Sequence, residues 1–226
     1  MIESVRDYVL KAWLKPTARD KQKKVGASDL SDPCSLCLWE KLHGVHKEYP
    51  SDWPMGAKIG TAIHAELEQV VRAEYGRDVY CEVRMEIGEY EGYGRIKSTS
   101  DLYVPGERLL VDYKTTTKKK LKHLSTMINA GLDTTDQKLL AYRAQTHLYG
   151  LGMQHTYGET PKELCILFVP RDAASPRDLL EWRFPYHQEA AEGVFERGRD
   201  LWELSDPPTG PSLECYYCSN YREIKQ

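Results

Sequence analysis

The chain has 226 residues, of which 41% are hydrophobic and 29% are charged. These fractions are ordinary for a soluble globular protein and exclude an intrinsically disordered chain. No stretch approaches about 18 consecutive apolar residues, so no membrane span is expected. The formal net charge of −3 disfavours a nucleic-acid binder only if the charge is spread evenly, because such binding depends on local basic patches.

The first element expected along the chain is a helix over residues 2–14, where apolar residues recur at helical spacing until Pro16. The segment 1–16 has acidic residues early and no apolar run before a small-residue cleavage site. We therefore expect no signal peptide, and a cytoplasmic location is the default. A short helix is predicted over 36–47, and a longer one over 56–75.

Next the spacing of apolar residues changes to two. Residues 79–87 alternate between apolar and mostly polar side chains, which predicts a half-buried strand. Two further strands are predicted over 99–104 and 108–113, around the turn pair Pro105 and Gly106. These segments indicate a meander of strands.

Helical spacing returns over residues 135–153, and a buried strand is predicted over 164–169. Another strand over 180–184 and a last helix over 187–204 follow. The order of helix, meander, helix, strand and helix predicts an α/β domain around one mixed sheet.

The densest chemical signal lies in the predicted hairpin. Asp101 is at the start of one strand, and Asp112 and Lys114 close the next. Residues two apart on a strand point to the same face. Two converging carboxylates would bind a hard cation such as Mg²⁺ or Mn²⁺, and a lysine beside them could stabilise charge on a phosphate. Two surface acids and a strand-end lysine would give the same pattern.

Four segments in order make the chain similar to the RecB-like branch of the PD-(D/E)XK nucleases, which includes CRISPR-associated and phage recombination exonucleases. They are GTAIHAELE, GRIKSTSDLYV, LLVDYKTT and AQTHLYG. That family often has an acid directly after the Gly-x-Ile element, where this chain has Lys97, and the metal-binding role is assigned to Asp101. The resemblance implies metal binding by His64, Asp101 and Asp112, catalysis by Lys114, and support of the site and the DNA by Gln145 and Tyr149.

Two basic patches could contact nucleic acid, although most such runs are solvated loops. One comprises Arg19, Lys21, Lys23 and Lys24. The other directly follows the predicted catalytic strand and comprises Lys118, Lys119, Lys120 and Lys122. We expect the second patch to line the path of the DNA backbone.

Four of the six cysteines form two CxxC pairs near the ends of the chain: Cys34, Cys37, Cys215 and Cys218. In a chain expected to be cytoplasmic, such clusters favour metal ligation over disulfides. Four thiolates can complete a zinc site or an iron–sulfur cluster, and spacing alone favours zinc.

The family resemblance instead implies an iron–sulfur cluster (4Fe-4S), which several RecB-like nucleases carry. Their cysteines divide one before the helical histidine and three near the C-terminus, whereas the division here is two and two. Either occupant would join the two ends of the chain and couple metal binding to folding.

The sequence thus predicts a single nuclease domain over 1–226, with an N-terminal helical part (1–55), a core (56–204), and a linker with the last CxxC pair (205–226). The expected function is divalent-metal-dependent DNA exonuclease activity on single strands or DNA ends, with a recombination or replication protein as a further partner. The alternatives are a structure-specific endonuclease and a non-catalytic module that binds DNA or a protein.

Overall fold

The computed structural model describes residues 4–6, 24–45, 55–130, 136–209, 215 and 218. Most of the helix expected over 2–14, and the basic residues Arg19, Lys21 and Lys23, lie outside the described residues. Among the helices that are described, none combines the length and the apolar character needed to cross a membrane.

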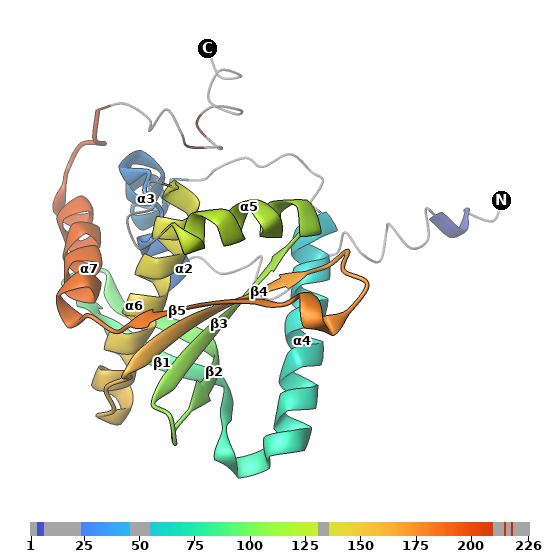
Figure 1. Cartoon of the computed structure of the whole chain (residues 1–226). Coiled ribbons are helices and arrows are strands. Elements are labelled where there is room, and N and C mark those ends of the chain that lie inside the picture. The colour runs from blue at the N-terminus through green and yellow to red at the C-terminus, as the bar shows by residue number, and fades with distance from the viewer. Residues whose placement is uncertain are drawn as a thin grey trace.

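One five-stranded sheet forms the centre of the molecule (Figure 1). The strands lie in chain order: β1 (Tyr80–Tyr90), β2 (Gly94–Val104), β3 (Leu109–Thr116), β4 (Glu163–Pro170) and β5 (Leu180–Pro185). Strands β3 and β4 are parallel, whereas the other neighbours are antiparallel. A parallel pair needs a long crossover connection, which two helices between β3 and β4 provide.

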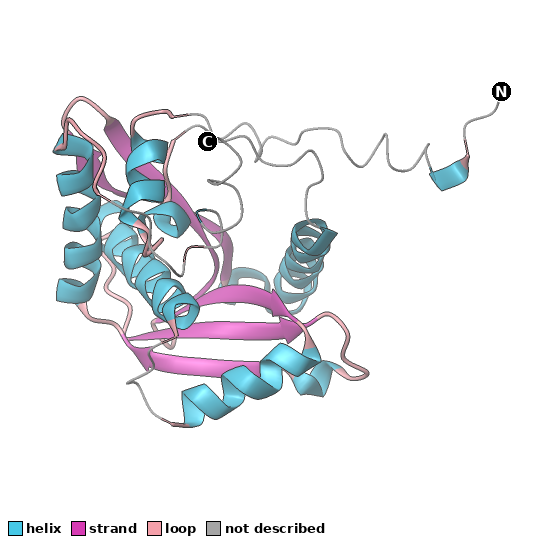
Figure 2. Cartoon of the chain, turned by 90° about the horizontal axis from the view of Figure 1, so that it is seen from above, coloured by secondary structure: helices cyan, strands magenta, loops and turns pink. Residues whose placement is uncertain are grey.

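The helices are distributed unevenly around this sheet. Figure 1 shows one long helix standing by itself on the right and a group of helices on the left, and Figure 2 shows another helix running alongside the strands. The lone helix is α4 (Met55–Tyr75), the group comprises α2 (Ala27–Leu30), α3 (Ser35–Leu42), α6 (Gln137–Tyr157) and α7 (Gln188–Glu203), and the helix alongside the strands is α5 (Lys118–Asn129). Two short 3₁₀ helices, η2 (Gly76–Asp78) and η3 (Pro176–Asp178), complete the described elements.

The two faces of the sheet bury different clusters. Along β4, Ile166 and Phe168 belong to the main core, which also contains Leu148 of α6. Cys165, between the positions of Leu164 and Ile166, belongs to a smaller cluster against which Leu67 of α4 packs. This alternation follows from the two-residue period of a strand. Helices α4 and α6 therefore lie against opposite faces.

The predicted α/β architecture is confirmed, with several local differences. The helix expected over 36–47 ends at Leu42, and the short helix α2 lies in a segment where a loop was expected. Strand β2 begins at Gly94, earlier than residue 99, because the sequence 94–98 contains polar residues that hide its alternation. Helix α5 was not predicted, because lysines fill its first turn. Its N-terminus is nonetheless capped by Thr117, whose side chain accepts a hydrogen bond from the Lys120 N–H.

Candidate active site

The candidate site lies at the point where strands β2 and β3 separate, which we call the fork. Strands β2 and β3 pair over only three positions, the last of which joins Leu102 to Val111. Beyond it, β2 remains paired with β1 and β3 remains paired with β4. Asp101 and Asp112 are the first residues past the last pair, so both carboxylates lie where the strands separate.

Beyond the last β2–β3 pair, the Asp101 side chain takes the place of a backbone partner on the neighbouring strand. Its Oδ2 accepts a hydrogen bond from the Tyr113 N–H at 2.5 Å, and its Oδ1 lies 3.0 Å from His64 Nδ1. His64 comes from α4, on the other side of the sheet from α6. This contact brings the histidine to the fork. Burial lowers the pKa of His64, but the hydrogen bond and the charge of Asp101 outweigh it and raise the pKa above its ordinary value.

Asp112 is the most buried acid of the site, with only 2% of its surface exposed. Its Oδ2 forms an ion pair with Lys114 Nζ at 2.8 Å and, apart from that contact, has no hydrogen-bond partner among the described residues. Burial raises the pKa of Asp112, and the attraction of Lys114 opposes that rise. A buried carboxylate with a single partner has unused acceptor capacity.

Helix α6 holds the lysine from the opposite side. Gln145 Oε1 accepts a hydrogen bond from Lys114 Nζ at 2.9 Å, and Gln145 Nε2 donates one to Tyr149 OH at 2.5 Å. The Lys114 ammonium also lies 4.8 Å from the centre of the Tyr142 ring, a cation–π contact. The predicted pair Gln145 and Tyr149 therefore acts as one hydrogen-bonded unit behind the lysine.

Glu82 is an acid near the fork that the sequence analysis missed. It lies on β1 between Cys81 and Val83, whose partners are Leu102 and Ser100, so it is opposite Asp101. Its φ of 53° is uncommon for a residue other than glycine. Partial burial raises the pKa of Glu82, and the charge of Asp101 adds to the rise. Nothing in the sequence indicated this position, because an acid at an exposed position of an alternating strand looks the same whether or not a carboxylate lies opposite.

No family model matches the chain, and no curated protein matches it. Solved structures do resemble it. SSO0001 has 16% identity and a TM-score of 0.53, with 96% of this chain and 94% of that chain covered. A putative exonuclease from Eubacterium rectale has 13% identity and a TM-score of 0.51, covering 100% and 95%. The alkaline exonuclease LHK-Exo from Laribacter hongkongensis has 11% identity and a TM-score of 0.51, covering 84% and 90%.

The chain shares the fold of these solved structures, two of which are described as exonucleases. Its low identity to these structures means that the similarity concerns the fold, whereas the roles of the residues at the fork need an argument from chemistry. Within this fold, the fork is where the side chains of β2, β3, α4 and α6 meet.

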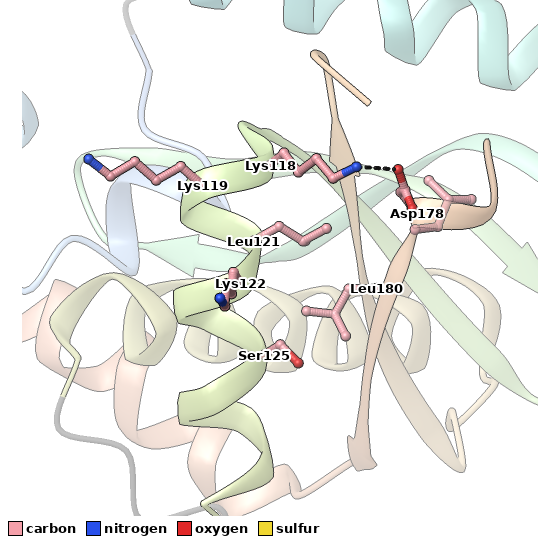
Figure 3. Close-up of a pocket in the computed structure, with 8 residues that line it drawn as sticks. Lys118, Lys119, Leu121, Lys122, Ser125, Asp178 and Leu180 are labelled. Atoms are coloured by element: carbon pink, nitrogen blue, oxygen red, sulfur yellow. Dashed lines mark hydrogen bonds and ion pairs between the residues drawn. The ribbon is translucent and has the colours of Figure 1, made fainter. Parts of the chain in front are cut away.

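The predicted basic patch of residues 118–122 begins α5 and lines a groove of about 510 Å³ (Figure 3). Lys118, Lys119 and Lys122 lie along one wall. Figure 3 shows Lys118 reaching across to Asp178, with which it forms an ion pair at 3.2 Å, whereas Lys119 points away from that contact. The lysines therefore lie on an ordered helix beside the end of β3.

The two CxxC pairs meet in space, as the sequence predicted. Cys37 Sγ lies 3.5 Å from both Cys215 Sγ and Cys218 Sγ, and Cys34 Sγ lies 3.7 Å from Cys218 Sγ. All four sulfur atoms lie within 4.8 Å of one another, and none belongs to a disulfide. Four thiols at these separations could bind a metal.

Proposed function

We propose that this chain is a divalent-metal-dependent DNA exonuclease. The observation that carries the proposal is the fork, where α4, β2 and β3 bring together His64, Asp101, Asp112 and Lys114. The folding of a sheet does not require a buried acid paired with a lysine at the point where two strands separate. Burying two charges is costly, so such groups favour a functional explanation.

The residue types at the fork suit a hard divalent cation, which takes carboxylate oxygens as ligands. Among the described residues, however, only the four cysteines already have their ligand atoms within 4.8 Å of one another. Asp112 has a buried oxygen with a single partner, and Asp101 and Glu82 place two acids opposite each other across β1 and β2. Like charges in that position are destabilising unless a cation lies nearby. We assign metal binding to His64, Asp101 and Asp112. Bound Mg²⁺ or Mn²⁺ would supply a Lewis acid and an activated water.

We assign Lys114 the role of stabilising negative charge on the scissile phosphate. Its ammonium group is fixed by Asp112 and Gln145, so little reorganisation is needed when negative charge develops on the scissile phosphate. Tyr149 orients the Gln145 amide so that its oxygen faces the lysine. The pair Gln145 and Tyr149 thereby supports catalysis through the position of Lys114.

Helix α5 is assigned to the DNA backbone. Its four lysines follow β3 directly, so they lie close along the chain to the strand that carries Asp112 and Lys114. Phosphate contacts fix the position of a nucleic acid without reading its sequence. This arrangement suits an exonuclease that works on single strands or DNA ends of any sequence.

The decisive experiment incubates the protein with end-labelled linear DNA, both single-stranded and double-stranded, and with circular single-stranded DNA. An exonuclease with Mg²⁺ or Mn²⁺ releases nucleotides from the linear substrates and leaves the circle intact. Opening of the circle would identify a structure-specific endonuclease with the same site. Tight binding of every substrate without cleavage, in either metal, would identify a non-catalytic module.

Metal dependence is tested in the same assay. Protein that has been stripped of divalent ions and kept in excess chelator should not cleave, because no other group at the fork can replace a cation. Activity should return when Mg²⁺ or Mn²⁺ is added in excess of the chelator. Undiminished cleavage in the chelator would contradict the proposal.

A further inference from the structure

The spacing of the four cysteine sulfurs carries information about what they bind. Three separations between Sγ atoms are 3.5, 3.5 and 3.7 Å, and every pair is within 4.8 Å. A zinc ion bound by thiolates at about 2.3 Å in a tetrahedron holds the sulfurs about 3.8 Å apart. The observed sulfurs therefore surround a space that fits one ion.

A four-iron cluster requires a wider arrangement. In such a cluster each cysteine binds a different iron at a corner of a cube, so the cysteine sulfurs are separated by about 6 Å. The largest separation here is below 4.8 Å. The iron–sulfur cluster implied by the family resemblance therefore does not fit this arrangement of thiols. The division of the cysteines into two pairs agrees, because two CxxC pairs are the usual pattern of a four-thiolate zinc site.

We infer that Cys34, Cys37, Cys215 and Cys218 bind a single zinc ion as a structural site that joins α3 to the C-terminal end of the chain. All four positions are filled by thiols, which leaves no open position for a substrate. Three of the cysteines are at most 5% exposed. A closed and buried site of this kind stabilises a fold and takes no part in hydrolysis.

Charged groups of both signs lie beside the site, where the Asp32 carboxylate accepts a hydrogen bond from the Cys34 N–H at 2.8 Å and Arg197 supplies a positive charge. Four thiolates around one divalent ion leave two net negative charges. Arg197 of α7 lies close enough to Cys34 for the charges to interact, and its guanidinium donates hydrogen bonds to the carbonyl oxygens of Leu30 at 2.8 Å and Pro33 at 3.4 Å. This arginine is thereby fixed beside the loop that leads into Cys34. Each thiol releases its proton to solvent when the ion binds.

The first test measures metals and acid-labile sulfide in the full chain, expressed in medium containing both iron and zinc and purified without oxygen. We expect one zinc per chain, no sulfide and no visible absorption. Four irons with four sulfides per chain, in a brown protein, would overturn the inference. One iron without sulfide would overturn the choice of zinc.

A second test does not depend on what the expression host supplies. The metal-free chain is offered Co²⁺, whose tetrahedral complex with four thiolates has a strong and characteristic visible absorption, and separately iron with sulfide. We expect one Co²⁺ per chain with that spectrum, displaced by Zn²⁺ in a one-to-one titration. Uptake of four irons and four sulfides into a folded chain would contradict the single-ion site.

The ligands are tested by substitution. Cys218→Ser should lower the bound zinc to well below one ion per chain, whereas Cys81→Ser, which changes a buried cysteine of the sheet, should leave the zinc content unchanged. If Cys218→Ser does not fold, the cobalt spectrum of the unaltered chain decides the number of thiolates. Full zinc content in a folded Cys218→Ser protein would exclude this cysteine as a ligand. The outcome is independent of whether the chain cleaves DNA.

Discussion

Lys114 is held on three sides by groups of different character. Asp112 contributes a carboxylate at 2.8 Å, Gln145 an amide oxygen at 2.9 Å, and Tyr142 the face of an aromatic ring at 4.8 Å. A lysine side chain otherwise loses considerable rotamer entropy when it is fixed. The three contacts hold the ammonium in one place before any substrate arrives.

The first prediction concerns the role of this lysine. Lys114→Ala should lower the rate of DNA cleavage by at least about 100-fold, the usual effect of removing one group that stabilises transition-state charge. DNA affinity, measured by fluorescence anisotropy, should change little, since the α5 lysines remain. Lys138→Ala is the matched control, because Lys138 also lies over the Tyr142 ring, at 5.6 Å, but is exposed. If folded Lys114→Ala cleaves DNA at the unaltered rate, the catalytic role assigned to this part of β3 is refuted.

The second prediction concerns His147 of α6, which lies away from the fork. It is 4% exposed, and its Nδ1 accepts a hydrogen bond from the His187 N–H at 3.3 Å. Burial, assisted by the positive charges of His187 and Arg143, lowers the pKa of His147 to about 4. As the pH falls below the ordinary histidine pKa of 6.5, the unfolded chain therefore binds a proton at His147. The folded chain does not bind it until the pH nears the lowered pKa of about 4.

Stability should consequently fall as the pH decreases from the ordinary histidine pKa toward the lowered one. Between about pH 7.5 and about pH 5, His147 should account for a loss of about 2 kcal/mol in the free energy of unfolding. Urea denaturation at the two pH values measures this loss. His147→Gln keeps a hydrogen-bond acceptor without a titrating group, so its loss should be smaller by that amount. Equal losses in the two proteins would show that His147 is not responsible.

The residues of the site were predictable to different degrees. His64, Asp112 and Lys114 stand within local segments that have characteristic neighbours, so the sequence context alone proposed them as site residues. Glu82 has no such context, because its proximity to Asp101 depends on the register between β1 and β2. The burial of Asp112 was equally hidden, since an acidic residue in a strand gives no sign that it is buried.

At the scale of elements, long periodic segments were predicted well and the connections between them were not. Helix α6 was expected over 135–153 and extends over Gln137–Tyr157. Helix α5 contains Leu121, Leu124 and Met127 at helical spacing, but its lysine-rich first turn made the segment resemble a basic loop. The fork could not be predicted, because the sequence does not specify how far two strands remain paired.

Helix α5 gives the third prediction. Replacing its four lysines with glutamine should weaken DNA binding and reduce the slope of log affinity against log salt by about 3, because fewer counterions are released. Affinities measured between low and moderate salt give the slope. The matched control neutralises four exposed basic residues of β1, β2 and η2: Arg77, Arg84, Arg95 and Lys97. If the control variant reduces the salt slope as much as the α5 variant does, the DNA backbone does not bind specifically along α5.

At the scale of the whole molecule, the fork and the cysteine site occupy different parts of the fold. The fork depends on the sheet, α4 and α6, whereas the cysteines join α3 to the end of the chain. Helix α3 also contacts the end of α7 through Trp39, whose ring N–H donates a hydrogen bond to the Leu204 carbonyl at 3.0 Å. The metal thus reinforces a layer that already has contacts of its own.

This separation leads to the fourth prediction. Cys215→Ala should remove one ligand and destabilise the α3–α7 layer by several kcal/mol, because the free energy of metal binding contributes to folding. Hydrogen exchange should accelerate first in α3 and α7, while the central strands β3 and β4 keep their protection. Cys165→Ala, in the sheet, provides the control and should accelerate exchange in β4 without loss of metal.

The same variant also tests whether the two sites are independent. Below its melting temperature, Cys215→Ala should retain cleavage per folded molecule within about two-fold, because sites that share no partners contribute additively. Lys114→Ala should show the opposite behaviour in metal and activity, with full metal content and cleavage lowered at least about 100-fold. Its melting temperature should fall, because the buried Asp112 carboxylate loses the partner of its Oδ2. If Cys215→Ala abolishes cleavage while hydrogen exchange in β3 and α6 is unchanged, the cysteine site takes part in the chemistry and the structural role assigned to it is wrong.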